Sequence, residues 1–108
     1  MYTMEEIKIK SKIVIDVVNL ILSYKDLSVD RIFLVGSYAS GRANDYSDID
    51  YLVQLKGGKR PLTYPEFNDM LEIRKKLDNP RIHVIYGTQE AQQSKFNRDP
   101  IKYAYKEL

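Results

Sequence analysis

With 108 residues, of which 17 are lysine or arginine and 15 are aspartate or glutamate, the chain is expected to form one domain (residues 1–108) and has a net charge of only +2. A hydrophobic share of 44% beside 30% charged residues excludes a disordered or fibrous protein, and the small net charge gives no electrostatic case for nucleic acid as a partner. The lack of cysteine excludes disulfides and thiolate metal sites, and it suits a cytoplasmic protein.

Neither an export signal nor a membrane span is predicted. Residues 1–12 are mixed polar and charged and lack a small-residue cleavage site. The most apolar stretch, residues 13–22, contains Asp16 and Asn19 and is too short to cross a bilayer. We therefore expect a soluble protein of the cytoplasm that has no membrane partner.

The first predicted element is a helix over residues 4–24. Its many isoleucines and valines favour a strand by propensity, but the run is longer than most strands. Five apolar residues also recur at helical spacing: Ile13, Val17, Leu20, Ile21 and Tyr24. We expect this helix to be buried over more than one face. Its second apolar stripe fits the core and a partner surface equally well: Val14, Val18 and Leu22.

Two strands follow. Residues 31–35 form a short apolar strand that Gly36 closes, and a short turn of helix comes next. Residues 48–55 alternate, which predicts a second strand with two distinct faces. The two sets are Ile49, Tyr51 and Val53, and Asp48, Asp50 and Leu52. Glycine and proline make residues 56–61 a loop.

The rest of the chain predicts a helix, a strand and two more helices. Thr63 with Glu66 three residues later is the capping-box signature of a helix that ends at Asn79-Pro80. The residues of one side are spaced by threes and fours and, apart from the arginine, are apolar: Phe67, Met70, Leu71, Arg74 and Leu77. Residues 81–86 form a strand, and Thr88 caps a polar helix that runs to about residue 96.

The last predicted helix starts at Asp99-Pro100, which supplies an N-cap and a first-turn proline. One side of it is apolar: Ile101, Ala104, Tyr105 and Leu108. Since helices and strands alternate along the chain, we expect an α/β (α+β) fold in which helices pack on a small mixed sheet of three to four strands.

Residues 35–53 contain the candidate functional residues. A strand that ends at Gly36 and a helical turn that opens at Ser37 leave backbone N–H groups free to bind a phosphate, and the Ser37 hydroxyl adds a donor. The next strand places Asp48 and Asp50 two residues apart, so both lie on one face with Cα atoms about 6–7 Å apart. That separation suits one shared divalent ion, or two ions about 3.5–4 Å apart.

Two carboxylates beside a phosphate repel it unless a cation lies between them. Mg²⁺ (or Mn²⁺) takes one or two carboxylates together with phosphate oxygens. The residues therefore predict metal-dependent handling of a nucleoside triphosphate, with Asp48 and Asp50 as metal ligands. Plainer interpretations exist for each residue: Asp48 and Asp50 as exposed strand acids, Ser37 as a helix N-cap and Gly41 as a helix C-cap.

The segment resembles the signature of the DNA polymerase β-type nucleotidyltransferase superfamily: Gly-Ser-x-Ala-x-Gly, a spacer, then Ser-Asp-x-Asp. It is most similar to the minimal nucleotidyltransferases that pair with helical HEPN proteins in toxin–antitoxin systems. Gly36 precedes Asp48 by twelve positions, as that pattern requires. Seven residues match: Gly36, Ser37, Ala39, Gly41, Ser47, Asp48 and Asp50. The length and the helix-first order fit the minimal family over nearly the whole chain.

The resemblance implies a nucleotidyltransferase fold and the transfer of AMP from ATP to a hydroxyl group of a partner protein or small molecule. Gly36 and Ser37 would bind the triphosphate, while Asp48 and Asp50 would hold Mg²⁺. The implied partner is a helical HEPN-type protein, and a homo-oligomer stays open.

Two further residues are candidates for nucleotide binding. Ser47 belongs to the matching signature. Arg42, like Lys59 and Arg60, can reach a triphosphate from its loop, although solvated loop charge explains all three equally well.

Active members of the superfamily usually carry a third carboxylate on the next strand of the sheet. The residue that we align with it here is His83; another strand register would place Arg81 or Ile85 there, and neither is a carboxylate. A neutral imidazole is a poor Mg²⁺ ligand, but it can act as a base near neutral pH. Two functions follow from this replacement. Either the protein transfers nucleotides with a two-carboxylate site, Asp48 and Asp50, in which His83 or a group from an oligomeric partner replaces the missing acid, or the chain is a catalytically degenerate binding module that acts through a partner protein.

Overall fold

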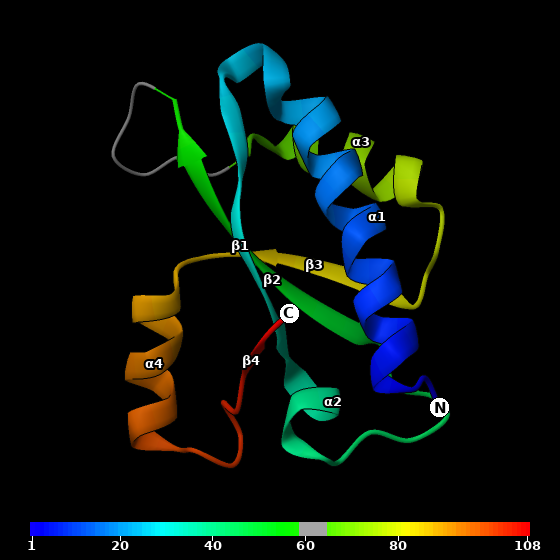
Figure 1. Cartoon of the computed structure of the whole chain (residues 1–108), viewed down its shortest axis with the longest axis vertical. Coiled ribbons are helices and arrows are strands. Elements are labelled where there is room, and N and C mark those ends of the chain that lie inside the picture. Colours follow the sequence, from blue (N-terminus) through cyan, green and yellow to red (C-terminus); the bar gives the residue numbers. More distant parts are fainter. Residues whose placement is uncertain (59–64) are drawn as a thin grey trace.

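The computed structural model describes residues 1–58 and 65–108. Its helices and strands largely alternate along the chain (Figure 1). In order they are α1 (Met4–Leu22), β1 (Leu27–Val35), α2 (Gly36–Ser40), β2 (Ile49–Gly57), α3 (Phe67–Leu77), β3 (Ile82–Tyr86), α4 (Gln89–Arg98) and β4 (Lys106–Glu107). A 3-10 turn over Ser23–Lys25 joins α1 to β1. None of the helices in the described ranges is long and apolar enough to span a bilayer.

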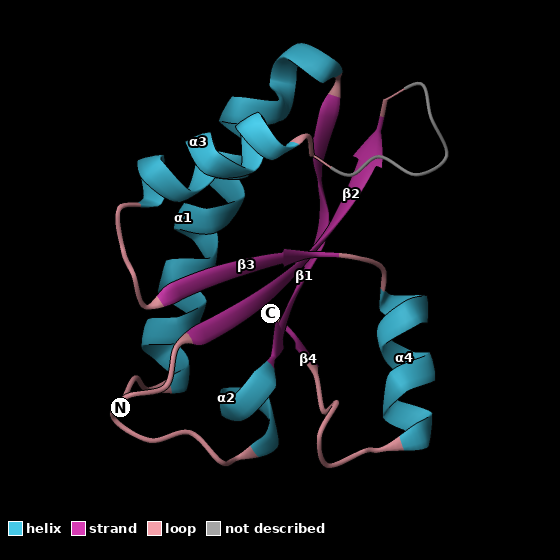
Figure 2. Cartoon of the chain, turned by 180° about the vertical axis from the view of Figure 1, so that it is seen from behind, coloured by secondary structure: helices cyan, strands magenta, loops and turns pink. Residues whose placement is uncertain are grey.

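The four strands form one mixed sheet in the order β3-β2-β1-β4. β1 runs antiparallel to both β2 and β4, and β2 runs parallel to β3. α1 and α3 lie together on one side of this sheet and α4 lies on the other (Figure 2). The expected α/β (α+β) class with three to four strands is therefore confirmed.

The main core lies between the sheet and the helices α1 and α3. Alternate residues of β1 and β2 point into it, because successive side chains of a strand face opposite ways. Its buried members are Ile7, Val14, Val18, Leu22, Leu27, Ile32, Leu34, Ile49, Tyr51, Val53 and Ile73. Tyr51 is fully buried there, and its hydroxyl donates a 2.7 Å hydrogen bond to the carbonyl oxygen of Ile7, which ties β2 to α1. One face of β2, with Ile49, Tyr51 and Val53, thus belongs to this core.

The helix predicted over residues 4–24 is confirmed as α1 and the 3-10 turn, but the burial expected of it was wrong. The second stripe, Val14, Val18 and Leu22, is the one that enters the core. Ile13 and Leu20, from the first stripe, are 50% and 64% exposed. Both stripes have helical spacing, so periodicity alone does not say which one faces the sheet.

Both central strands are longer than the sequence predicts. β1 starts at Leu27 rather than at residue 31, and β2 continues to Gly57, within the segment expected to be a loop. The two strands pair along this whole length, with an irregularity between Val29 and Arg31. Asp48, predicted to open the second strand, lies just before it.

The helix predicted to start near Thr63 begins instead at Phe67, and Glu66 is its N-cap rather than its third residue. Thr63, like the loop residues Lys59 and Arg60, lies outside the described residues. The predicted apolar side is also mostly outward: Phe67 and Leu71 are exposed, while the buried apolar residue of α3 is Ile73.

The predicted strand over residues 81–86 and the helix capped by Thr88 are confirmed as β3 and α4. The final helix is not formed. Asp99 does accept hydrogen bonds from the backbone N–H groups of Ile101 and Lys102, as an N-cap would. After that single turn the chain becomes extended and pairs with β1 as β4.

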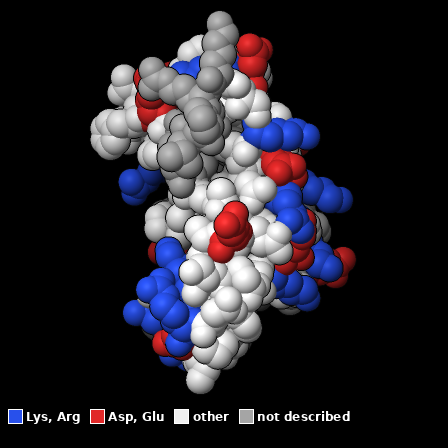
Figure 3. Space-filling view, turned by 90° about the vertical axis from the view of Figure 1, so that its left-hand side faces the viewer, with Lys and Arg blue, Asp and Glu red and all other residues white. Residues whose placement is uncertain are grey.

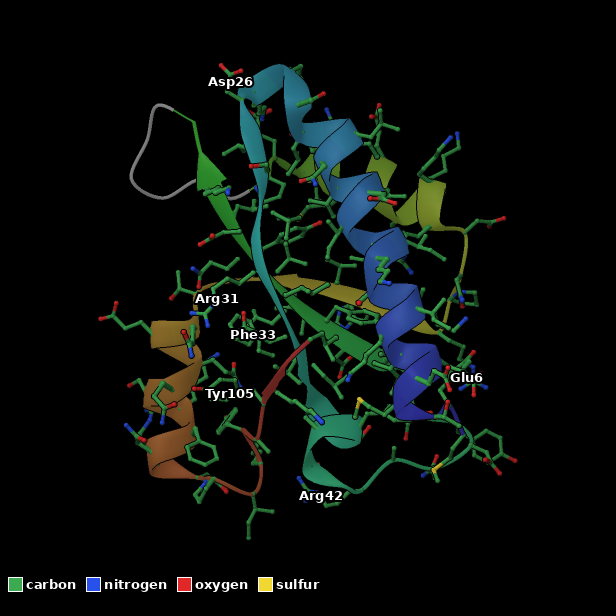
Figure 4. The ribbon with its side chains drawn as sticks, viewed as in Figure 1. Glu6, Asp26, Arg31, Phe33, Arg42 and Tyr105 are labelled. Atoms are coloured by element: carbon green, nitrogen blue, oxygen red, sulfur yellow. The ribbon has the colours of Figure 1, made fainter. Side chains whose placement is uncertain are left out.

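Contacts with β1 explain why this strand replaces the predicted helix. Arg31 forms an ion pair with Glu107 and also bonds Gln89 at the start of α4. Tyr105 packs edge-to-face on Phe33 at 5.7 Å between ring centroids (Figure 4). Phe96 of α4 then packs on Tyr105 at 6.0 Å. This aromatic chain fixes α4 over the second face of the sheet.

A buried carboxylate joins α3 to the end of α1. Asp69 is 6% exposed, and it accepts a 2.8 Å hydrogen bond from the Tyr24 hydroxyl and lies 2.9 Å from the Lys25 ammonium. Burial raises the pKa of the Asp69 carboxyl group, but the bonds from Lys25 and Tyr24 outweigh burial and hold that pKa below its ordinary value of 3.8.

This lowered pKa predicts an acid-sensitive contribution to stability. A carboxyl group whose folded-state pKa is depressed stabilises the fold above its unfolded pKa and loses that contribution as the pH falls through its folded value. Wild type should therefore exceed Asp69→Asn in free energy of unfolding near pH 6, with a difference that shrinks as the pH falls below about 4. Urea unfolding from pH 3 to 7 measures this, with Glu72→Gln on the exposed side of α3 as the control. A difference that does not change with pH would contradict the assignment.

Candidate active site

The turn from β1 into α2 is built on Gly36. Its φ of +71° lies in the left-handed region that favours glycine. Val35 precedes it as the N-cap without a side-chain hydrogen bond, so Ser37 is not the N-cap that one interpretation of the sequence proposed. At the other end Gly41, with φ +73°, is the C-cap, as the sequence predicts.

Gly36 is also required by its contact with Asp50. The two residues meet because Val35 pairs with Asp50 across β1 and β2. A Cβ atom added to Gly36 would lie 2.2 Å from Oδ2 of Asp50, well inside contact distance. The absent side chain thus leaves room for one carboxylate oxygen directly beside the start of α2.

His83 lies on the other side of the same carboxylate. It is the neighbour of Asp50 in the parallel pairing of β2 with β3. Its Nδ1 lies 3.2 Å from Oδ1 of Asp50. The His83 side chain is 64% exposed and that of Asp50 is 26% exposed, so the pair is open to a ligand. The two oxygens of Asp50 therefore have different neighbours, Gly36 and His83.

Asp48 lies two residues before Asp50, in an exposed position at the end of a tight turn. That turn is closed by Ser47, whose hydroxyl accepts a 2.9 Å hydrogen bond from the Asn44 N–H. Asp48 and His83 both line a cavity of about 390 Å³ between α3 and β3. Ser47 thus has a local role in holding the turn that presents Asp48.

A second cavity, of about 340 Å³, lies between the Asp50 side of the sheet and α4. Its lining comes from β1, β2, β3, α4 and the turn after α4: Val35, Gly36, Asp50, Leu52, Ile85, Tyr86, Gly87, Thr88, Ala91, Gln92, Lys95, Lys102 and Tyr103. Lys95, Lys102 and Tyr103 are not among the site residues predicted from the sequence. They lie far from the Gly-Ser and Asp-x-Asp signature and belong to no motif, so no signal in the sequence marks them.

Arg42, also a candidate for nucleotide binding, follows the C-terminal end of α2 (Figure 4). It lines neither of the two cavities. Its backbone N–H donates to the Ser37 carbonyl, and its Nε lies 3.4 Å from the Ser40 hydroxyl oxygen. The structure therefore brings together Gly36, Asp50 and His83 and leaves Arg42 at the far end of α2.

The sequence predicts Asp48 and Asp50 as the ligands of a divalent ion; in the structure Asp48 lines the cavity between α3 and β3, and Asp50 lines the cavity beside α4. Over residues 1–58 and 65–108 no three His, Cys, Asp or Glu side chains gather closely enough to hold a metal ion by themselves. Mg²⁺ needs no such cluster, because it binds through one or two carboxylates and fills its other positions with water and phosphate oxygens. Oδ2 of Asp50 lies against Gly36, and Asp48 is the second carboxylate near it in sequence.

Comparison with known families agrees with this geometry. The family model described as "Nucleotidyltransferase domain" matches residues 15–107. That match extends from within α1 to β4 and includes every element that contributes to the two cavities. A search of curated proteins gave no match.

The contact between Gly36 and Asp50 can be tested with a matched pair of variants. Gly36→Ala and Gly41→Ala both place alanine at positive φ, which costs about 1–2 kcal/mol in either case. Only Gly36→Ala also displaces the Asp50 carboxylate, because no atom lies within 4 Å of a Cβ at Gly41. We expect both variants to have a lower free energy of unfolding in urea than wild type. Gly36→Ala should lose more than Gly41→Ala, because only its Cβ clashes with Asp50. Gly36→Ala alone should weaken ATP–Mg²⁺ binding, by about tenfold or more, equivalent to about 1.4 kcal/mol. Equal binding by the two variants in titration calorimetry would contradict the contact.

Proposed function

Since the chain belongs to the nucleotidyltransferase domain family, we propose that it transfers AMP from ATP to a hydroxyl group of a partner protein or small molecule, with Mg²⁺ or Mn²⁺ as the cofactor. The observation that carries this proposal is the Asp50 carboxylate held against Gly36 at the start of α2. A carboxylate in that place repels a triphosphate by itself, so the arrangement favours a metal-bound nucleotide.

The reaction is a displacement at the α-phosphorus of ATP. The acceptor hydroxyl oxygen forms a new bond to that phosphorus, and the bond to the bridging oxygen of the β-phosphate breaks, so that pyrophosphate leaves. Asp48 and Asp50 would hold the ion, which supplies positive charge that offsets the repulsion between these carboxylates and the phosphates. The backbone at Gly36 and Ser37 would position the triphosphate.

His83 is the proposed acceptor of the hydroxyl proton. With a proton on Nδ1, the ring donates to Oδ1 of Asp50 at 3.2 Å. Nε2 is then the nitrogen that is free to accept a proton. In this arrangement Oδ1 of Asp50 orients the imidazole, while Oδ2 is available to the metal ion.

The proposed acceptor is a helical HEPN-type protein, as the resemblance of residues 36–50 suggests. A partner of that kind needs an apolar surface to dock on, and α1 and the turn after it carry one. Four of their large apolar side chains are at least half exposed: Ile9, Ile13, Leu20 and Tyr24. An amphipathic helix is the element that such a stripe accommodates.

Incubation with ATP labelled on the α-phosphate, Mg²⁺ and a candidate HEPN protein should label that protein. Labelling should be lost in Asp48→Asn and in Asp50→Asn, because each variant removes one charged metal ligand. Asp45→Asn, an exposed change in the same loop, is the matched control and should retain labelling. ATP labelled on the γ-phosphate should give no label, since pyrophosphate leaves. The proposal fails if no acceptor is labelled and ATP does not shift the melting temperature.

His83 separates this function from the second candidate, a catalytically degenerate binding module. That candidate is favoured by an imidazole in the place where a third carboxylate is expected. If His83 is the base, His83→Ala should slow labelling by about 10²–10⁴-fold with little change in ATP affinity, and His83→Asp should retain activity. If the module is degenerate, wild type releases no pyrophosphate, and the double change Asp48→Ala and Asp50→Ala leaves partner binding intact. An unchanged rate in His83→Ala would exclude its role as the base.

A further inference from the structure

Two lysines from separate elements converge on one tyrosine in the cavity that contains Asp50. The Nζ of Lys95, on α4, lies 5.9 Å from the centroid of the Tyr103 ring. The Nζ of Lys102, in the turn after α4, lies 5.4 Å from the same centroid. Both lysines and Tyr103 line the 340 Å³ cavity. We propose that Lys95 and Lys102 bind the β- and γ-phosphates of the nucleoside triphosphate, an inference that rests on the proposed function.

The positions of these residues are fixed by hydrogen bonds from within the fold. Gln92 is buried, and its side chain donates a 3.1 Å hydrogen bond to the Tyr103 carbonyl oxygen. The Tyr103 N–H donates to the Asp99 carbonyl oxygen at 3.0 Å. The Asp99 side chain accepts from the Lys102 N–H, also at 3.0 Å. The turn that carries Lys102 and Tyr103 is therefore held against α4, and both lysines project from an ordered support.

The charges around this tyrosine are unbalanced. Within the described ranges neither Lys95 nor Lys102 forms an ion pair with a carboxylate. The ring of Tyr103 offers only the weak attraction of an aromatic face. Two ammonium groups near one ring repel each other, and an anion between them would relieve that repulsion. Lys and Arg side chains gather at the lower left of the face that carries α4 (Figure 3).

The opposite wall of the cavity identifies the kind of anion. Gly36 and Asp50 form that wall, so it offers a carboxylate and, by the proposed function, a metal ion. A single phosphate bound beside Gly36 and Asp50 would be too short to reach the two lysines as well. An extended polyphosphate reaches both walls, with its α-phosphate near Asp50 and its later phosphates toward the lysines. A triphosphate is therefore the ligand whose charge suits both sides of this cavity.

The test uses methionine variants of the full chain, because methionine keeps an unbranched apolar stem and removes the charge. Lys95→Met, Lys102→Met and the double variant are compared with Lys106→Met, which changes an exposed lysine on β4 that does not line the cavity. Calorimetry measures binding of three probes, each with and without Mg²⁺: inorganic tripolyphosphate, α,β-methylene-ATP and AMP. The double variant should bind the first two about tenfold or more weakly, and AMP binding should not change.

Each outcome either supports or overturns the lysine site. Equal binding of tripolyphosphate by wild type and the double variant overturns it, and so does wild-type chain that binds none of the probes. An equal loss for AMP also overturns it, because the lysines would then not be selective for the later phosphates. Labelling that falls in the double variant while α,β-methylene-ATP binds normally would point to the acceptor and would overturn it as well.

The same measurements separate this inference from the proposed function. If wild type transfers no AMP but binds tripolyphosphate through the two lysines, the transfer reaction is rejected and the lysine site stands. If wild type transfers AMP at a rate and an ATP affinity that the double variant matches, the transfer reaction stands and the lysine site is rejected. Unfolding curves that coincide for all four variants confirm that the substitutions leave the fold intact.

Discussion

The register of β1 against β2 is the constraint on which the site depends. Val35 pairs with Asp50, and this pairing brings the carboxylate to Gly36 at the point where β1 turns into α2. A slip of one residue would turn Asp50 toward α1 and exchange it for an apolar side chain, since neighbouring residues of a strand face opposite ways. The slip would bury a charged group in the main core, which is costly without a partner. Hydrophobic packing around Tyr51 therefore also holds the Asp50 carboxylate in position.

Local signals were sufficient wherever the structure is decided by neighbours in sequence. The cap at Thr88, the stop after α3 and the left-handed glycine at Gly41 all follow from side-chain chemistry within one turn. The resemblance to the superfamily led to His83 as the residue in place of a third carboxylate on the next strand, and the structure pairs that residue with Asp50. What those two side chains do chemically stays a prediction.

Distant contacts decided the features that the sequence did not reveal. Residues 99–108 have a helix cap and a helical stripe, yet an ion pair with Arg31 across 76 positions and the packing of Tyr105 on Phe33 favour a strand. In α1 both stripes have helical spacing, and contact with the core buries Val14, Val18 and Leu22. Lys95 and Lys102 line the same cavity as Gly36 only because the turn after α4 folds back toward it. No short stretch of sequence predicts that contact.

The return of β4 to β1 has a consequence for the order in which the protein assembles. The Gly36–Asp50 half of the site closes a short loop, whose entropy cost is small, and it needs only residues that are synthesised early. The half that carries Lys95 and Lys102 is fixed through Tyr105, Phe96 and the pairing of residues 106–107 with β1, which closes a much longer loop. Non-local pairing of that kind is slow. In a nascent chain Gly36 and Asp50 can therefore come together before Lys95 and Lys102 are in place, and the proposed affinity for a triphosphate would arise as one of the last events of folding.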